Sequence, residues 1–177
     1  MLKQELIDFE EEIRVLFEAG KIKAPVHFSV GSEDELIEIF KQVKPTDWVF
    51  STHRSHYHAL LKGIPKEWVR NEILAGRSMH LNSREHNFFT SSIVAGICPI
   101  AVGVAMTGEK VWCFVGDMAG ETGIFHECVK YAHGLKLPIK FVVEDNHYSV
   151  DTPTELIWRY NYERKYPHMG SGAWVIF

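Results

Sequence analysis

The stretch Lys110-Val111-Trp112-Cys113-Phe114-Val115-Gly116-Asp117 decides the fold class of this sequence. Its continuous apolar run predicts a buried strand, because a strand covered on both faces carries apolar residues at every position. A helix is predicted over residues 121–133 and a second strand over residues 138–143. A strand–helix–strand unit has a right-handed crossover and makes its two strands parallel, so the predicted fold class is α/β.

Two amphipathic helices are predicted near the beginning of the chain. Residues 1–20 form an N-terminal helix, because apolar residues recur there at steps of four and three and Gly20 follows them. Ser32 and Glu35 have the spacing of a capping box, which starts a second helix that Pro45 ends.

The middle of the chain is predicted to contain a strand, a helix, a loop and a second helix. Residues 48–50 form the strand, residues 65–76 the helix that begins at a proline, and the polar residues 77–87 the loop. No charge occurs over residues 87–108, which is long enough to span a membrane. Pro99 and many small or polar residues make this run too weakly apolar for lipid contact, so a buried helix is predicted and a membrane span is the alternative.

The composition indicates one globular domain over residues 1–177, in which residues 154–177 form a short C-terminal segment without a clear period. A formal net charge of −4 argues against nucleic acid or a membrane surface as a partner. Cys98, Cys113 and Cys128 fit neither a disulfide framework nor a zinc knuckle. The acidic N-terminal residues do not resemble an export signal, so a reducing, cytoplasmic location is expected.

Polar side chains follow both strands of the predicted strand–helix–strand unit. Gly116 and Asp117 follow the first strand, and Glu144, Asp145 and Asn146 follow the second. Because parallel strands end at the same edge of a sheet, these oxygens are expected to converge and to suit Mg²⁺ with a diphosphate ligand. In the alternative interpretation, Asp117 only caps the next helix and Asn146 only makes a turn.

Other phosphate-binding motifs are not found. The P-loop pattern fails at residues 103–110, where a glutamate stands in place of the lysine. The dinucleotide fingerprint fails at residues 116–120, because the glycine spacing is wrong, so neither NAD nor FAD is expected. A response-regulator-like phosphate site would use the same strand-end aspartate, but its acidic pair and its lysine are missing.

Four further motifs accompany Gly116-Asp117 and Asn146. They are His27-x3-Gly31-x-Glu33, Thr52-His53-Arg54-Ser55-His56, Gly76-Arg77-Ser78-Met79-His80 and Ser92-Ile93-Val94-x4-Pro99. With these motifs in this order, residues 22–153 resemble the alpha subunit of pyruvate-dehydrogenase-type 2-oxo-acid dehydrogenase first components. The resemblance implies a thiamine-diphosphate-binding fold, with a largely parallel central sheet and helices on both faces, and the cofactors thiamine diphosphate and Mg²⁺.

The resemblance also implies which residues bind the cofactor. Asp117 and Asn146 would bind Mg²⁺ through side-chain oxygens and Tyr148 through its backbone carbonyl, while Arg54 would contact the diphosphate. In the alternative interpretation, Arg54 is a surface cation. The other cofactor-binding candidates are His53, Ser92, Val94, Gly116, Met118 and Ala119.

Two histidines, His27 and His80, match residues that line the reaction centre of the family. They are the catalytic candidates, because an imidazole with a pKa near neutrality can exchange protons. The alternative is a structural role for both. A zinc site formed by His53, His56 and His58 is not favoured, because no fourth ligand is evident.

Three departures from the family pattern bear on activity. Met118 stands where the family usually has a glycine that lets the backbone approach the diphosphate, and His53 stands where tyrosine is common. After Pro153 there is no counterpart of the histidine-rich loop that covers the cofactor, so the sequence resembles a shortened version of the subunit. The glutamate that activates the cofactor is supplied in the family by a separate beta subunit.

The expected function is therefore that of an enzyme subunit. It would take part in the decarboxylation of a 2-oxo acid and in transfer of the acyl or aldehyde unit, with a lipoyl domain as one possible acceptor. Activity is expected only with a beta-type partner, as two alpha and two beta chains. The alternatives are a transketolase-like or carboligating subunit that acts on a sugar, and a non-catalytic cofactor-binding scaffold.

Overall fold

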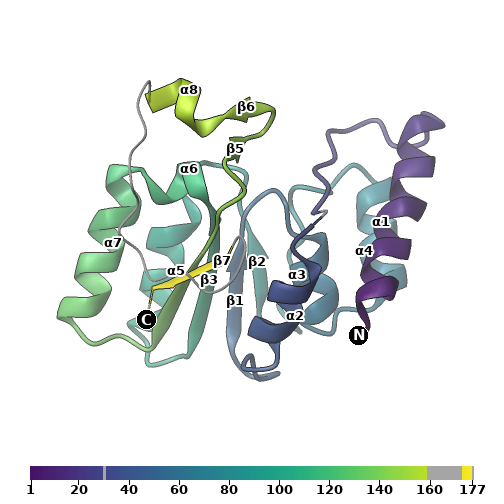
Figure 1. Cartoon of the computed structure of the whole chain (residues 1–177). Coiled ribbons are helices and arrows are strands. Elements are labelled where there is room, and N and C mark those ends of the chain that lie inside the picture. Colours follow the sequence, from purple (N-terminus) through teal and green to yellow (C-terminus); the bar gives the residue numbers. More distant parts are fainter. Residues whose placement is uncertain (30, 159–172, 177) are drawn as a thin grey trace.

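The computed structural model describes residues 1–29, 31–158 and 173–176, and its centre is a five-stranded sheet with the order β2-β1-β3-β4-β7 (Figure 1). The pairs β2–β1, β1–β3 and β3–β4 are parallel, and β7 is antiparallel to β4. The largely parallel sheet predicted from the sequence is confirmed. The strands are β1 (Trp48–Ser51), β2 (Phe88–Thr90), β3 (Val111–Gly116), β4 (Ile139–Glu144) and β7 (Ala173–Ile176).

Helices cover both faces of this sheet (Figure 1). Successive residues of β3 alternate between the faces, so Trp112 and Phe114 enter one core whereas Cys113 and Val115 enter the other. The α/β class with helices on both faces is confirmed. The first core is shared with α1 (Lys3–Glu18), α2 (Glu33–Phe40), α3 (His56–Leu61) and α4 (Lys66–Leu74), and the second with α5 (Ile97–Ala105) and α7 (Gly123–Gly134).

The uncharged run over residues 87–108 is not one buried helix, so that prediction is wrong. The first part of the run pairs with β1 as strand β2, and α5 begins only at Ile97. Asn87 and Ala95 have backbone φ angles of 51° and 53°, and such left-handed conformations interrupt a right-handed helix. Within the described ranges, no helix is both long and apolar enough to span a bilayer.

The start of α2 also differs from the prediction. Ser32 is the N-cap residue, but its side chain makes no cap hydrogen bond, so the predicted capping box is wrong. Instead, Glu33 Oε1 accepts the N–H of Gly31 at 2.9 Å and the hydroxyl of Tyr57 at 3.1 Å. Tyr57 belongs to α3, a helix that was not predicted from the sequence, and this contact links the start of α2 to α3.

Short elements follow the two longest strands. A separate helix, α6, occupies Asp117–Gly120, so α7 starts two residues later than predicted. After β4 come β5 (Tyr148–Ser149), β6 (Thr152–Pro153) and α8 (Thr154–Trp158). Within the predicted C-terminal segment 154–177, residues 159–172 and 177 lie outside the described residues, and strand β7 was not predicted.

The parallel pairing places the carboxyl ends of four strands at one edge of the sheet. Ser51 at the end of β1 pairs with Thr90 at the end of β2, and Gly116 at the end of β3 pairs with Glu144 at the end of β4. The loops that follow these residues therefore lie side by side, as the general rule for ligand sites in open α/β sheets requires.

Candidate functional site

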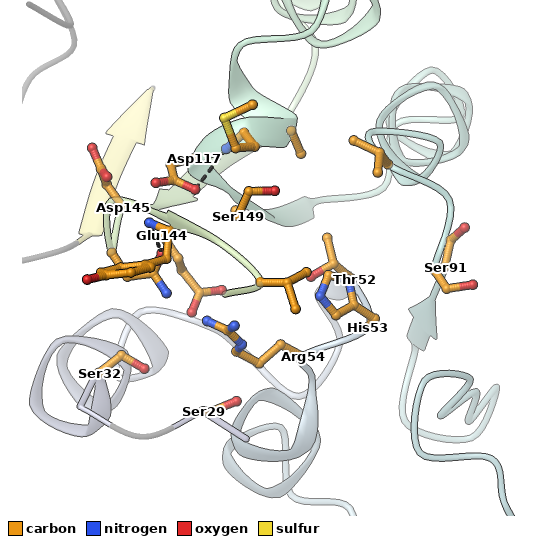
Figure 2. A pocket seen from close by; sticks show the side chains of 18 of the residues that line it. Ser29, Ser32, Thr52, His53, Arg54, Ser91, Asp117, Glu144, Asp145 and Ser149 are labelled. Carbon is orange, nitrogen blue, oxygen red and sulfur yellow. Dashed lines mark hydrogen bonds between the residues drawn. The ribbon is translucent and has the colours of Figure 1, made fainter. Parts of the chain in front are cut away.

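A cavity of about 230 Å³ lies at the edge where the four parallel strands end (Figure 2). The loops after β1, β2 and β4 and the helix α6 after β3 form most of its wall, joined by the loop before α2 and by β5. The cavity brings together all the residues predicted to hold the cofactor or the metal, namely His53, Arg54, Ser92, Val94, Gly116, Asp117, Met118, Ala119, Asn146 and Tyr148.

Asp117 is the first residue of α6 and is buried, with 3% of its surface exposed. Its Oδ1 accepts the backbone N–H of Met118 at 2.8 Å. Asp117 is not the N-cap residue of either helix that follows β3, because Gly116 is the N-cap of α6 and Thr122, whose side chain accepts the N–H of Phe125, is the N-cap of α7. A carboxylate has about four acceptor positions, so the bond to Met118 leaves capacity for a cation ligand.

Asn146 follows β4, and its Oδ1 accepts the backbone N–H of Tyr148 at 3.0 Å. The side chain therefore makes a turn, yet it also lines the same cavity as Asp117. An amide oxygen has two lone pairs, so one is left for a metal. Among the described residues, no three His, Cys, Asp or Glu side chains are placed to hold an ion, so Mg²⁺ bound here would keep water or phosphate ligands, as it prefers.

Arg54 lies on the wall of the cavity and is half-buried. Its Nε is buried and has no hydrogen-bond partner in the described part of the chain, and Arg54 forms no ion pair there. A buried donor without a partner costs about 1–3 kcal/mol. An anion in the cavity would remove this cost, so Arg54 fits the diphosphate of the implied cofactor.

His53 and His27 form a pair of rings beside Arg54. Their centroids are 4.4 Å apart, although His27 itself is not among the cavity-lining residues. Burial, followed by the charges of His27 and Arg54, lowers the pKa of His53 to about 4. Burial, followed by Arg54 and His56, lowers the pKa of His27 below its ordinary value. The environment of His27 thus shifts its pKa downward from the near-neutral value expected for a proton carrier, and its catalytic role stays a prediction.

His56 and His80, which belong to two of the motifs in the sequence, do not line the cavity. His80 is exposed and is not among the lining residues, so its catalytic role stays a prediction. His56 is buried between Glu10, with Nδ1 at 3.2 Å from Oε1, and Ser78, with Nε2 at 2.9 Å from Oγ. This arrangement has the residue types of a hydrolytic triad, but Ser78 is fully buried and no substrate can reach it.

Two carboxylate residues that line the cavity, Glu144 and Asp145, were predicted to follow the second strand but were not predicted to be site residues. Asp145 is buried, and its Oδ1 accepts the N–H of His147 at 3.1 Å. Glu144 is the last residue of β4 and lies with Oε1 at 3.1 Å from Nε2 of the buried His58. The signal that identifies both is their position after β4, which matches that of Gly116 and Asp117 after β3.

The sequence of this chain is similar to a known family over nearly its whole length. Residues 2–165 match the family model described as "Dehydrogenase E1 component". The pyruvate dehydrogenase E1 component subunit alpha of Porphyra purpurea is 34% identical over 166 residues, which cover 81% of this chain and 48% of that protein.

Two further relatives show the same partial coverage. The alpha subunit of the acetoin:2,6-dichlorophenolindophenol oxidoreductase of Bacillus subtilis (strain 168) is 31% identical over 167 residues, 85% of this chain and 50% of that protein. The chloroplastic pyruvate dehydrogenase E1 component subunit alpha-3 of Arabidopsis thaliana is 33% identical over 164 residues, 80% of this chain and 38% of that protein. The chain thus spans half the length, or less, of these curated relatives. Because the family model matches most of the chain, this protein belongs to the dehydrogenase E1 component family.

Proposed function

We propose that this chain is the magnesium- and diphosphate-binding part of an alpha-type subunit in a thiamine-diphosphate-dependent enzyme. The observation that carries the proposal is the buried Nε of Arg54, which has no hydrogen-bond partner within residues 1–29, 31–158 and 173–176, in the same cavity as Asp117 and Asn146. A metal-bound diphosphate needs both a cation for its charge and hard oxygen ligands for its metal. Family membership supports the same assignment.

The residues of the cavity divide into a metal side and an anion side. Asp117 and Asn146 would hold Mg²⁺ through their side chains and Tyr148 through its carbonyl, while Arg54 would bind the diphosphate. The backbone around Ser92 and Val94 would face the aminopyrimidine ring. Thiamine diphosphate, when bound, supplies the electron sink for decarboxylation of a 2-oxo acid.

The histidines of the anion side contribute orientation and hydrogen bonds rather than charge. Because the pKa values of His53 and His27 are both lowered, the two imidazoles are neutral at pH 7. A neutral imidazole can donate through one nitrogen and accept through the other, which suits it to hold a proton at a defined ring atom. We retain His27 and His80 as proposed catalytic residues, with His80 dependent on a substrate that extends beyond the cavity.

A second polypeptide is part of the proposal. Ile93 and Val94 are 72% and 65% exposed on the cavity wall, and apolar side chains beside a ligand site favour a covering surface. Among the described residues, Glu144 is the glutamate that lines the cavity, and its carboxylate contacts His58. We therefore infer that a beta-type subunit supplies the activating glutamate, in an assembly of two alpha and two beta chains.

The proposed substrate is a 2-oxo acid, whose acyl unit passes to an acceptor such as a lipoyl domain. Acetoin is a second candidate, because the Bacillus subtilis relative, named for acetoin, is 31% identical and the Porphyra purpurea relative, named for pyruvate, is 34% identical. Two alternatives are a carboligating reaction on a sugar and a scaffold without catalysis. The first predicts turnover of the ketose phosphate in the activity assay below, and the second predicts cofactor binding without any contribution to turnover.

Calorimetric titration tests the cofactor assignment. The purified chain is titrated with thiamine diphosphate with and without Mg²⁺, beside the variants Asp117→Ala and Asn146→Ala. We expect saturable, Mg²⁺-dependent binding that both substitutions weaken. Equal heats for all three proteins would contradict the proposal.

An activity assay tests the reaction and the partner. The chain is combined with the product of a neighbouring beta-type gene and supplied with pyruvate, acetoin or a ketose phosphate, with 2,6-dichlorophenolindophenol as the electron acceptor. Reduction of the dye with pyruvate, but not with acetoin or the ketose phosphate, supports the 2-oxo-acid assignment. Reduction of the dye with acetoin supports the second candidate. Full turnover by the isolated chain would refute the need for a partner.

A further inference from the structure

The carboxylate of Glu10 on α1 is shared by two segments that are distant in the sequence. Its Oε1 accepts the backbone N–H of Ser29 at 3.3 Å. The same oxygen lies 3.2 Å from Nδ1 of His56, the first residue of α3. All three residues are buried, so solvent does not compete for these contacts. Because a buried donor without an acceptor is costly, both segments are held to this one oxygen.

The partners of His56 assign the hydrogen of its imidazole. A carboxylate only accepts hydrogen bonds, so Nδ1 of His56 carries the hydrogen that points to Glu10. On the other side of the ring, Nε2 lies 2.9 Å from the Oγ of Ser78. In the neutral ring this second nitrogen accepts the hydroxyl hydrogen of Ser78. Both ring nitrogens therefore have directed partners, and the orientation of the imidazole at the start of α3 is fixed.

The two segments that Glu10 joins carry the pair of histidine rings on the anion side of the cavity. Ser29 follows His27 by two residues, and His56 follows His53 by three. Both segments contribute to the cavity wall, the first through Ser29 and the second through His53 (Figure 2). The centroids of the two rings are 4.4 Å apart. A shift of either segment away from Glu10 would change this separation, because so few residues lie between each ring and its anchored neighbour.

We propose that Glu10 is a positioning residue that holds His27 against His53. It acts through the backbone N–H of Ser29 and the imidazole of His56, so His56 is a positioning residue as well. The inference rests on the proposed function for its consequence, since it takes the anion side of the cavity to bind the diphosphate of thiamine diphosphate. It assigns a part in that binding to α1, a helix none of whose residues lines the cavity.

Two substitutions at position 10 separate the hydrogen bonds from the bulk of the side chain. Glu10→Met keeps the length of the side chain but removes the acceptor, so the N–H groups of Ser29 and His56 lose their partner. Glu10→Gln keeps an amide oxygen, whose two lone pairs can accept from the same two donors. The rings should move apart in the first variant and stay together in the second. Glu12→Met is the matched control, because Glu12 lies on the same helix and pairs with Arg70 at 2.6 Å, outside the cavity lining.

The experiment follows the imidazole resonances of His53 by NMR during a pH titration of the ligand-free chain. Burial, followed by the charges of His27 and Arg54, lowers the pKa of His53 to about 4. In Glu10→Met, solvent gains access to His53 as His27 moves away, so the titration midpoint should rise by about one pH unit or more. In Glu10→Gln and in the control it should stay where it is in the natural chain.

Calorimetric titration with Mg²⁺–thiamine diphosphate gives a second readout. Glu10→Met should bind this probe about fivefold more weakly, which is the effect of one lost hydrogen bond. Glu10→Gln and Glu12→Met should stay within about twofold of the natural chain. A role of Glu10 in stability alone would lower the free energy of unfolding, as expected for Glu12→Met, without moving the midpoint of His53.

The outcomes separate this inference from the proposed function. If the midpoint of His53 is the same in Glu10→Met as in the natural chain, the inference is overturned, whether or not the chain binds the cofactor. If the natural chain does not bind Mg²⁺–thiamine diphosphate, the proposed function fails, and the titration of His53 still decides whether Glu10 positions the rings.

Circular dichroism establishes that each variant is folded, and the natural chain decides if Glu10→Met is not. Its NMR spectra should then show a hydrogen on Nδ1 of His56 and slow exchange of the amide of Ser29, as the two contacts with Glu10 require. A hydrogen on Nε2 alone, or rapid exchange of the Ser29 amide, would overturn the inference.

Discussion

The ring of His53 stands edge-on to the ring of His27, with 4.4 Å between the centroids and 72° between the ring planes. A proton on either ring would face the other ring and the nearby guanidinium of Arg54. Burial and these neighbours lower the pKa of both histidines, that of His53 to about 4. The pair is therefore uncharged at pH 7, and the positive charge at this wall of the cavity comes from Arg54.

The lowered pKa of His53 predicts a specific pH dependence of stability. Between the folded pKa of about 4 and the ordinary value of 6.5, the unfolded chain binds more protons than the folded chain. Stability therefore rises with pH across this window and is lost as the pH falls through it. We expect His53→Gln to reduce the loss between pH 7 and pH 4.5 by on the order of 1–2 kcal/mol, after allowance for solvent screening.

Urea unfolding at a series of pH values measures this effect. His80→Gln is the matched control, because His80 is exposed and lies outside the cavity lining. If the free energy of unfolding changes with pH in the same way for the natural chain and for His53→Gln, His53 is not the group responsible for the pH dependence of stability.

Arg54 is expected to show a trade between stability and binding. Replacing Arg54 with Gln removes a buried donor that has no partner in the part of the chain that the structure describes, so the ligand-free chain should be as stable as before or more stable. If Arg54 binds the diphosphate as proposed, the same change would remove charge-assisted hydrogen bonds, which are worth about 1.5–3 kcal/mol each. The affinity for thiamine diphosphate should therefore fall at least about tenfold.

Thermal unfolding of the ligand-free chain and calorimetric titration test the two halves of this prediction. Arg70→Gln provides the contrast, because Arg70 forms an ion pair of 2.6 Å with Glu12 outside the cavity lining. That variant should lose stability and keep its affinity. A loss of stability in Arg54→Gln as large as that in Arg70→Gln would count against a guanidinium held ready for an anion.

The strand-end residues could be predicted because one rule of topology places them. Parallel strands end at a common edge, so Asp117 after β3 and Asn146 after β4 had to approach one another once both strands were identified. His80 could not be placed in this way, because it lies in a polar loop whose course depends on tertiary contacts. The residue that Glu144 approaches, His58, lies on a helix that the sequence pattern did not reveal.

The errors in the predicted fold have local causes in the sequence. The uncharged residues 87–108 contain both a strand and a helix, and an apolar run alone does not separate the two. The backbone is left-handed at both Asn87 and Ala95, and although asparagine is enriched in this conformation, alanine gives no residue-type signal for it. Strand β7 pairs with β4 from far along the chain, and four residues are too few to show a period.

Asp117 is expected to control the metal requirement of binding. Asp117→Asn keeps the size of the side chain and an acceptor for the N–H of Met118 but removes the negative charge. Mg²⁺ prefers charged oxygen ligands, so the concentration of Mg²⁺ needed for half-maximal binding of thiamine diphosphate should rise about tenfold or more. A Mg²⁺ titration at a fixed cofactor concentration measures this value, and an unchanged midpoint would exclude Asp117 as a ligand.

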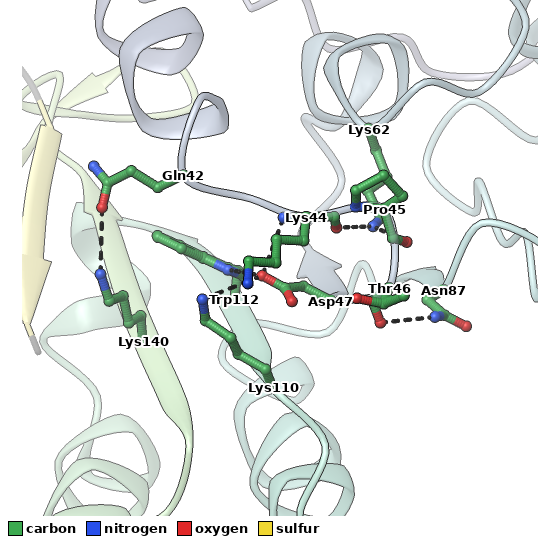
Figure 3. A network of polar contacts seen from close by, with 10 residues as sticks. All are labelled: Gln42, Lys44, Pro45, Thr46, Asp47, Lys62, Asn87, Lys110, Trp112 and Lys140. Atoms are coloured by element: carbon green, nitrogen blue, oxygen red, sulfur yellow. Dashed lines mark hydrogen bonds and ion pairs between the residues drawn. The ribbon is translucent and has the colours of Figure 1, made fainter.

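Asp47 is expected to matter for stability alone. It is 3% exposed and precedes β1, at the opposite end of the strand from the cavity, and its Oδ2 accepts the N–H of Lys44 at 3.1 Å and the Nε1–H of Trp112 at 3.0 Å (Figure 3). Lys110 Nζ lies 3.5 Å from the same oxygen. Asp47→Ala leaves the buried indole donor without its acceptor, so unfolding in urea should show a loss of about 2–4 kcal/mol.

The same variant is a test of how local the site is. Affinity for Mg²⁺–thiamine diphosphate, measured where Asp47→Ala is still fully folded, should stay within about twofold of the natural chain, since distant substitutions act independently. A large loss of affinity would mean that the two ends of the sheet are coupled.

Met118 stands where the resembling family has a glycine, and the structure explains which property of glycine is at issue. Met118 lies within the helix α6 and is not among the described residues with positive φ, so no special backbone conformation requires glycine there. Met118 lines the cavity, so under the proposed function its bulk would limit the approach of the diphosphate to the backbone. Met118→Gly should therefore raise the affinity for thiamine diphosphate about threefold to tenfold, while it lowers stability by about 0.5–1 kcal/mol through backbone entropy.

The variant Met118→Ala separates the effect on affinity from the effect on stability, because alanine removes most of the bulk without that entropic cost. Calorimetric titration should then show a gain in affinity, with no loss in the free energy of unfolding. If neither variant binds thiamine diphosphate more tightly, the side chain of Met118 does not obstruct the ligand. The inference that methionine in place of glycine limits the approach of the diphosphate to the backbone would then be wrong.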